Sequence, residues 1–150
     1  MAGIVGLTEI QHQNGTSAAT VDTSGNLTIK TGTTTVQGEN TATTNLQQGL
    51  CKHWISVNMS TAAVNDSFNA GSITDNGTGN FTNTITNPMS NVNYANTIGS
   101  KYVQAWGQLA FFRSTNRTTT TYVTGSVNYH TNGNETDSVQ FDTSIDGDLA

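Results

Sequence analysis

The chain has little charge and no concentration of positive charge. Only 10% of its 150 residues are Asp, Glu, Lys or Arg, against about 25% in an average soluble domain. The five basic residues are scattered and the formal net charge is −5, so no basic patch is available to follow a phosphate backbone. We therefore do not expect nucleic acid as a partner.

Cysteine and long apolar runs are also scarce. Cys51 is the only cysteine, so no disulfide can form within the chain, and we expect a small buried hydrophobe here rather than a reactive thiol. No apolar run approaches the roughly 18 residues of a membrane-spanning helix. Residues 1–7 lack the basic residues of a signal peptide. We expect neither membrane insertion nor export by a standard signal.

Threonine, asparagine and glycine take the place of the missing charged residues. Thr is β-branched and fits a half-buried pleated surface, whereas Asn and the 15 glycines suit turns. The single proline, the aromatics and the many β-branched residues are unlike a disordered chain. The composition predicts an all-β fold, and the length allows one compact core at most.

The first 36 residues have the pattern of four short strands separated by turn signals, at residues 8–12, 18–22, 26–30 and 33–36. Each strand carries one or two large apolar residues, too few for a single chain to build a core. We therefore expect residues 1–50 to be an attachment or trimerisation segment, with a polar linker over residues 37–50 that ends in a short helical turn at residues 47–49. The candidate residues for contacts with copies of the chain, or for docking to another protein, are Ile4, Val5, Leu7, Ile10, Val21, Leu27 and Ile29.

Residues 51–150 alternate between apolar and polar positions. Ile55, Val57 and Met59 alternate with Trp54, Ser56 and Asn58, as in a strand with one wetter face. Seven or eight such strands over about 100 residues predict an antiparallel, jelly-roll-like β-sandwich as the C-terminal domain, residues 51–150. The expected core residues are Trp54, Phe68, Ile73, Phe81, Trp106, Phe111 and Phe112.

The clearest motif lies between Trp54 and Tyr94. Asn76-Gly77 accepts positive φ at both central positions of a tight turn and predicts a hairpin. Its surroundings run in a fixed order: Trp54, Asp66-Ser67-Phe68-Asn69, Ser72-Ile73-Thr74-Asp75-Asn76-Gly77-Thr78-Gly79, Phe81, Pro88-Met89 and Asn93-Tyr94. In this order and spacing the segment resembles the C-terminal domains of bacteriophage tail fibres and related virion appendage proteins. Residues 9–27 are similar to the short connector that often precedes such domains.

The resemblance implies a viral structural protein of the virion, on a surface appendage or on the capsid exterior. It implies a homotrimer whose partners are its own copies and other tail or capsid proteins, with a host cell-surface glycan as a further candidate partner. The implied function is host attachment by a tail fibre or receptor-binding tip, where three weak sites add avidity. The alternative is a capsid decoration or head-fibre protein that coats or stabilises the shell.

The C-terminal third matches the family most loosely, as expected of receptor-facing loops. Exposed tyrosines can stack on sugar rings with little loss of entropy. Arginines in a Thr-rich loop can pair with acidic surface groups, although a merely solvated loop is the alternative. The candidate receptor-contact residues are Tyr102, Tyr122, Tyr129, Arg113 and Arg117.

The sequence predicts no catalytic residues, no metal site and no cofactor. The closest acidic residues lie in Gly-rich and Asn-rich sequence, which favours a solvated or cation-binding loop over the paired carboxylates of a sugar hydrolase. The histidines lack metal-ligand spacing. We therefore expect a non-enzymatic protein, with a depolymerising enzyme as a third hypothesis. The acidic residues are Glu135, Asp137, Asp142, Asp146 and Asp148, and the histidines are His12, His53 and His130.

Overall fold

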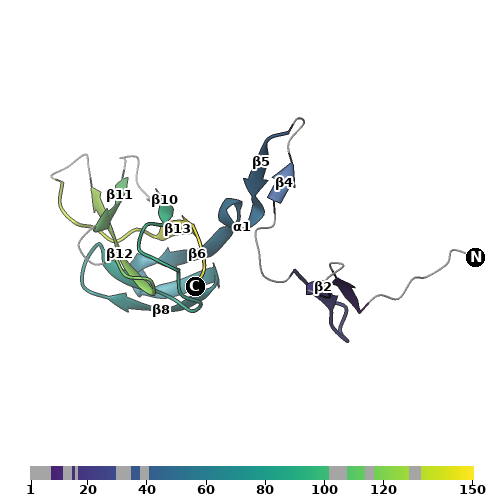
Figure 1. The fold of residues 1–150 in the computed structure, drawn as a ribbon. Helices are drawn as coiled ribbons and strands as arrows, with labels where there is room; N and C mark the ends of the chain where they lie inside the picture. Colours follow the sequence, from purple (N-terminus) through teal and green to yellow (C-terminus); the bar gives the residue numbers. More distant parts are fainter. Residues whose placement is uncertain are drawn as a thin grey trace, which may run out of the picture. The chain divides into compact units, whose positions relative to one another are not determined.

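The computed structural model describes residues 8–11, 15, 17–29, 35–37, 41–101, 108–113, 117–128 and 133–150 (Figure 1). Strands make up 62% of the structure and helix 4%, which confirms the all-β prediction. The chain divides into two compact units, Met1–Leu46 and Gln47–Ala150, and each is described by itself. Within the described ranges, no helix has the length and apolar character needed to cross a membrane.

The first unit contains two small antiparallel sheets, one in the order β1-β2-β3 and one pairing β4 with β5. Strands occur close to all four predicted positions. β5 is an addition, because it lies in the stretch interpreted as a linker, whereas α1 confirms the helical turn expected there. The bounds are β1 (Glu9–Gln11), β2 (Ser17–Val21), β3 (Leu27–Ile29), β4 (Thr35–Gln37), β5 (Thr43–Asn45) and α1 (Leu46–Gly49).

The turn between β2 and β3 shows how the sequence specifies these hairpins. The Asp22 carboxylate accepts hydrogen bonds from the backbone N–H groups of Ser24 (2.8 Å) and Asn26 (2.9 Å). Gly25 lies between them with φ +84°, a conformation that glycine adopts at low cost. Hydrogen bonds from the side chain and backbone of Asn26 lower the pKa of Asp22.

The second unit is a sandwich of two four-stranded antiparallel sheets, which confirms the predicted sandwich. The strand orders are β10-β13-β6-β7 and β11-β12-β9-β8. These orders place β7 and β8, β9 and β10, β10 and β11, and β12 and β13 in different sheets, so the chain changes sheet at each of these four steps. The bounds are β6 (Cys51–Asn58), η1 (Met59–Thr61), β7 (Ala63–Phe68), β8 (Ala70–Asp75), β9 (Asn80–Ile85), β10 (Ala95–Lys101), β11 (Gln108–Arg113), β12 (Thr121–Asn128) and β13 (Gln140–Asp146).

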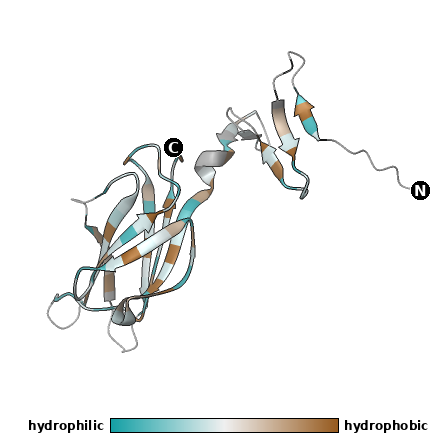
Figure 2. Cartoon of the chain, turned by 90° about the horizontal axis from the view of Figure 1, so that it is seen from below, coloured by the Kyte–Doolittle hydropathy of each residue, from teal (hydrophilic) through white to brown (hydrophobic). Residues whose placement is uncertain are grey.

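The core lies between the two sheets and is built from alternate residues of their strands. Ile55, Val57 and Met59 are buried as predicted, and they pack with Phe81 and Phe141. Figure 2 shows the resulting bands of hydrophobic residues along the sandwich strands. Each such side chain contributes on the order of 1.5–3 kcal/mol by leaving water. A second cluster comprises Ile85, Met89, Tyr94, Tyr122 and Ile145.

Two aromatics predicted to be in the core lie elsewhere. Phe68 is 53% exposed and Trp54 is only half-buried. They pair directly across β6 and β7, on the side of the sheet opposite Ile55, so the core prediction is wrong for both. Of the other expected core residues, Phe81 is buried, Ile73, Phe111 and Phe112 are half-buried, and Trp106 lies outside the described residues.

The β8–β9 hairpin forms as predicted, but its turn is longer than the sequence indicated. The loop closes through hydrogen bonds from Asn76 N–H to the Asn80 carbonyl (2.9 Å) and from Asn80 N–H to the Gly77 carbonyl (3.0 Å). Positive φ occurs at Gly77 (+114°) and Gly79 (+63°), and not at Asn76. The two-residue turn predicted for Asn76-Gly77 is therefore wrong, because Gly79 takes part in the reversal.

Asn69 makes the crossing from β7 to β8. Its φ of +56° lies in the left-handed region, which Asn tolerates better than most residues. Its side-chain amide donates to the carbonyls of Lys52 (2.8 Å) and Asn87 (3.3 Å), and its Oδ1 accepts from Asn87 N–H (2.7 Å). Its carbonyl accepts from Thr86 N–H (3.0 Å). This one residue ties the corner to β6 and to the segment that follows β9.

Candidate ligand-binding surface

The sheet β10-β13-β6-β7 carries two rows of side chains on its outer face. Directly paired residues of antiparallel strands share a face, so the register assigns each row. The first row is Thr97, Ser144, Trp54 and Phe68, and the second is Gly99, Asp142, Ser56 and Asp66. Aromatic residues thus lie next to carboxylates on the side of the sheet that faces away from the core.

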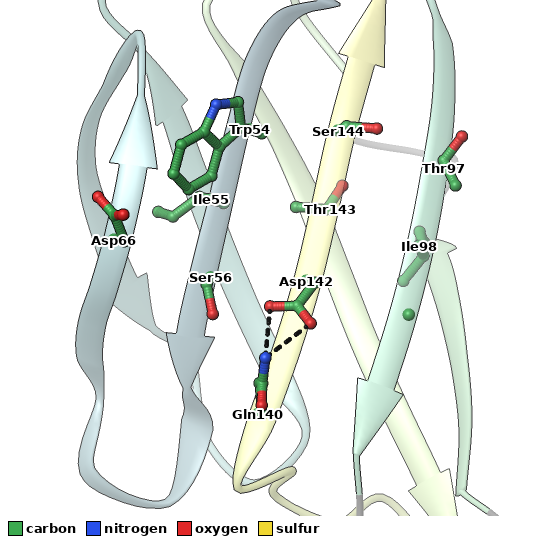
Figure 3. Close-up of a pocket in the computed structure, with 11 residues that line it drawn as sticks. Trp54, Ile55, Ser56, Asp66, Thr97, Ile98, Gln140, Asp142, Thr143 and Ser144 are labelled. Carbon is green, nitrogen blue, oxygen red and sulfur yellow. Dashed lines mark hydrogen bonds between the residues drawn. The ribbon is translucent and has the colours of Figure 1, made fainter.

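A groove of about 540 Å³ lies over these rows, and we call it the outer-face groove. Figure 3 shows the Trp54 ring on β6, the Asp66 carboxylate on β7 and the Asp142 carboxylate on β13. The Gln140 side-chain amide donates to both oxygens of Asp142, at 3.0 and 3.3 Å, and Ser67 N–H donates to Asp66 at 2.8 Å. Each carboxylate is therefore oriented by a neighbour and keeps lone pairs that can accept further hydrogen bonds.

The groove combines an aromatic side chain with hydrogen-bond acceptors. Trp54 lines the groove, and Phe68 lies outside its lining but pairs with Trp54 on the same face of the sheet. Among the described residues that line the groove, none is basic. Lys101 stands on the same face, opposite Gln140 at the end of β10. The surface suits a ligand that is apolar on one side, donates hydrogen bonds and carries no negative charge.

Sequence reasoning missed Trp54 and Phe68 as surface residues because aromatic character was taken as a sign of the core. The correct signal was the alternation itself. Trp54 has the same parity as the polar residues Ser56 and Asn58. Phe68 likewise has the parity of the exposed Asp66. Parity along a strand decides the face, and hydrophobicity alone does not.

Tyr122 is a core residue, so the prediction of an exposed receptor contact at this position is wrong. It is 1% exposed, because its side chain points between the sheets into the cluster that contains Ile85 and Ile145. Two other predicted contact residues, Tyr102 and Tyr129, lie outside the described residues.

Arg113 and Arg117, the remaining predicted contacts, are engaged within the sandwich. The Arg117 guanidinium lies 4.6 Å from the centroid of the Tyr94 ring and donates to the Tyr94 carbonyl at 2.9 Å. Arg113 forms an ion pair with Glu135. Both arginines and Tyr122 border a second cavity of about 350 Å³. The structure thus brings three predicted residues together, but the two charges already have partners inside the chain.

His53 is fully buried and forms hydrogen bonds at both ring nitrogens. Nδ1 lies 3.2 Å from the Asn69 carbonyl, which can only accept, so we assign the hydrogen to Nδ1. Nε2 then accepts from the Tyr122 hydroxyl at 2.7 Å. Burial lowers the pKa of His53 and raises the pKa of Tyr122. Both side chains are therefore neutral members of the core.

The C-terminal acidic residues are spread over several surroundings rather than gathered in one loop. Asp137 accepts from Gly79 N–H at 2.7 Å, while Asp146 and Asp148 border a third cavity of about 300 Å³. Within the part of the chain that the structure describes, no group of three His, Cys, Asp or Glu residues could hold a metal ion. His12 and His130 lie outside this part.

Cys51 is exposed, so its predicted burial is wrong. It is the first residue of β6, and the strand becomes buried only from Lys52 onward. The thiol donates a hydrogen bond to the His53 carbonyl at 3.1 Å.

Four of the predicted docking residues share one face of the β1-β2-β3 sheet. Ile10 pairs with Ala19, Ala19 pairs with Ile29, and Val21 pairs with Leu27. These five residues are called the N-terminal apolar face below. Ile10, Ile29 and Leu27 are 53%, 54% and 61% exposed. The opposite face carries Glu9, Thr20 and Thr28, and the other predicted docking residues, Ile4, Val5 and Leu7, lie outside the described residues.

The outer-face groove and the N-terminal apolar face are two surfaces that the described packing leaves uncovered. Their interpretation depends on their own chemistry and on the resemblance carried by residues 54–94. No protein-family model, no curated protein and no solved structure matches the chain.

Proposed function

We propose that this chain is a non-enzymatic structural protein of a bacteriophage virion, a homotrimeric surface appendage of the tail-fibre or receptor-binding-tip kind that serves host attachment. In this proposal the N-terminal segment carries assembly and docking to other virion proteins, and the sandwich is the displayed part. The N-terminal apolar face is the observation that carries the assembly role. The virion role and the number of three copies rest on the sequence resemblance.

The small N-terminal sheet needs a partner layer. Its strands have three to five residues, and a single layer of this size cannot bury its own apolar side chains. Each large apolar side chain left in water forgoes about 1.5–3 kcal/mol of burial free energy. The N-terminal apolar face has no charged residue, and Glu9 lies on the opposite face. Identical copies can therefore meet through this face without like-charge repulsion.

The oligomeric state tests the assembly role. We expect the full chain to be a trimer in light scattering after size exclusion, and a Leu27→Ser and Ile29→Ser double variant to be a monomer with the near-ultraviolet circular dichroism of a folded sandwich. Thr28→Ser changes the opposite face of the same strand and is expected to leave the trimer intact. A monomeric wild-type chain, or a double variant that stays trimeric, would contradict the proposal.

Localisation on the particle tests the virion role. Gold-labelled antibody against the sandwich should mark the tail in electron micrographs of virions that carry the protein. Label over the capsid surface would instead favour the decoration or head-fibre hypothesis. Absence from purified virions would reject both.

A further inference from the structure

The outer-face groove is lined by one aromatic residue, Trp54, and a second, Phe68, lies beside it on the same face of the sheet. Phe68 is 53% exposed, and Trp54 is half-buried directly opposite it. The core lies on the other side of the sheet, where Ile55 packs. The two aromatic side chains therefore lie on the outer face, where a ligand in the groove can contact Trp54 directly.

The polar groups beside Trp54 are mainly acceptors. Asp66 and Asp142 carry carboxylates, whose oxygens accept hydrogen bonds, and each has one described neighbour that donates to it. A pyranose ring has a complementary surface, because it presents an apolar face of C–H groups and a rim of hydroxyl donors. Hydrogen bonds from a hydroxyl to a carboxylate belong to the stronger, charge-assisted kind.

Size and charge narrow the class of ligand. A volume of about 540 Å³ lies within the range of roughly 300–1,000 Å³ that is usual for small-molecule sites. Two carboxylates face the ligand, and no basic residue is among the described residues that line the groove. A phosphate, a sulfate or a uronate would be repelled by this field. An uncharged sugar would not be repelled.

We propose that the outer-face groove binds an uncharged hexose unit of a surface polysaccharide. The apolar face of the sugar ring stacks on Trp54 and Phe68, and its hydroxyls donate to Asp66 and Asp142. The inference rests on the proposed function, since it names the ligand class that the attachment role would recognise. It describes binding alone, with no bond made or broken.

Titration of the full-length protein tests the site. The probes are neutral trisaccharides of glucose, galactose and mannose, with trigalacturonate and choline as charged comparisons, followed by calorimetry and tryptophan fluorescence. At least one neutral trisaccharide should bind. Trp54→Ala should weaken that binding about tenfold or more, equivalent to ~1.4 kcal/mol. Asp142→Asn should weaken it as well.

A matched control comes from the other sheet. Leu109 on β11 is 52% exposed, so Leu109→Ala also removes an exposed apolar side chain but should leave sugar affinity unchanged. If Trp54→Ala fails to fold, Asp66→Asn alters an exposed residue that lines the groove, and Phe68→Ala alters the exposed neighbour of Trp54. Both should lower the affinity. Wild-type affinity in all the groove variants that fold would overturn the proposal.

Three further results would overturn it. They are failure of every neutral trisaccharide to bind at millimolar concentration, binding of trigalacturonate or choline alone, and release of new reducing ends, which would make the groove a hydrolytic site. Adsorption of virions carrying Trp54→Ala separates this inference from the proposed function. Normal adsorption together with lost sugar binding supports the groove and argues against attachment as its role. Lost adsorption with unchanged sugar affinity supports attachment and overturns the groove.

Discussion

The hydroxyl of Tyr122 lies 2.7 Å from Nε2 of His53, and the two rings meet edge to face with centroids 5.5 Å apart. The histidine belongs to β6 and the tyrosine to β12, so this hydrogen bond joins the two sheets through the core. Neither ring is more than 1% exposed. An acceptor left unpaired at this depth would have no water to replace its partner.

Tyr122→Phe is therefore expected to destabilise the sandwich by about 1–3 kcal/mol, because it leaves the buried Nε2 without a donor. Urea unfolding of wild type and variant measures the difference. Tyr94→Phe is the matched control, since the Tyr94 hydroxyl donates to the Thr118 carbonyl in a partly buried position (3.0 Å) and its loss should cost less. Equal stability of Tyr122→Phe and wild type would show that the inter-sheet hydrogen bond contributes nothing.

Stability should fall as the solution becomes mildly acidic. Burial lowers the pKa of His53 below its ordinary value of 6.5, so the unfolded chain takes up a proton at a higher pH than the folded chain does. The contribution of His53 is complete above pH 6.5 and is lost as the pH falls below that value toward the folded-state pKa. Urea midpoints measured on either side of pH 6.5 should show this decline. His53→Gln should be less stable but should depend less on pH; the same slope in both proteins would assign the effect to other groups.

Gly79 and Gly133 form a pair that separates close packing from backbone strain. Their φ values are similar, +63° and +69°, but a Cβ on Gly79 would lie 2.5 Å from the Ser126 carbonyl oxygen, whereas a Cβ on Gly133 meets nothing within 4 Å. Both alanine variants should lose roughly 1–2 kcal/mol through the left-handed conformation. Gly79→Ala should lose a further 1–3 kcal/mol or so through overpacking. Thermal unfolding measures the stability loss of each variant. Equal losses would mean that the loop around Gly79 shifts to make room for the added Cβ.

Asn69 allows a comparable separation at the crossing between the sheets. Asn69→Gly removes the three amide hydrogen bonds to Lys52 and Asn87 but relieves the left-handed backbone, and we expect a net loss of about 1–3 kcal/mol. Asn69→Ala removes the same hydrogen bonds and also keeps the left-handed backbone strain. We therefore expect it to be roughly 1 kcal/mol less stable than Asn69→Gly. Chemical unfolding compares the three proteins. If Asn69→Gly were as stable as wild type, the side-chain hydrogen bonds would contribute no net stability, and Asn69 would matter only because it tolerates positive φ.

The strands were predictable from sequence where alternation is strong, as for Ile55 and Val57, and the hairpin at Gly77 was predictable from turn chemistry. β5 was not, because Thr43–Asn45 is polar and gains its strand form by pairing with β4. The groove was even harder to predict from the sequence. Its groove depends on which strand lies beside which, and the pairing of Asp66 and Asp142 with Ser56 follows from sheet order rather than from any local pattern.

The burial of Tyr122 and the internal partners of Arg117 could not be predicted from the sequence for a related reason. The partner of Arg117 is Tyr94 and that of Tyr122 is His53, each far away in sequence. A single side chain carries no sign of such a partner, so an arginine in a Thr-rich stretch looks solvated and a tyrosine in a strand looks available. Only the fold decides which polar ends are already satisfied.

The pairing of β6 with β13 has a consequence for biosynthesis. β13 lies between β10 and β6, and Val57 at the start of the domain pairs with Phe141 near its end. Contacts that span nearly a whole domain give a high contact order and slow folding. On the ribosome, β6 can pair with β7 early, but β10 and the other edge of β6 can form their pairs only after β13 emerges, whereas the N-terminal sheet is complete much earlier. In the proposed trimer, neighbouring nascent chains can therefore associate through their N-terminal sheets before their sandwiches have folded. A chain that terminates before Gln140 would lack β13 and could not complete its sandwich.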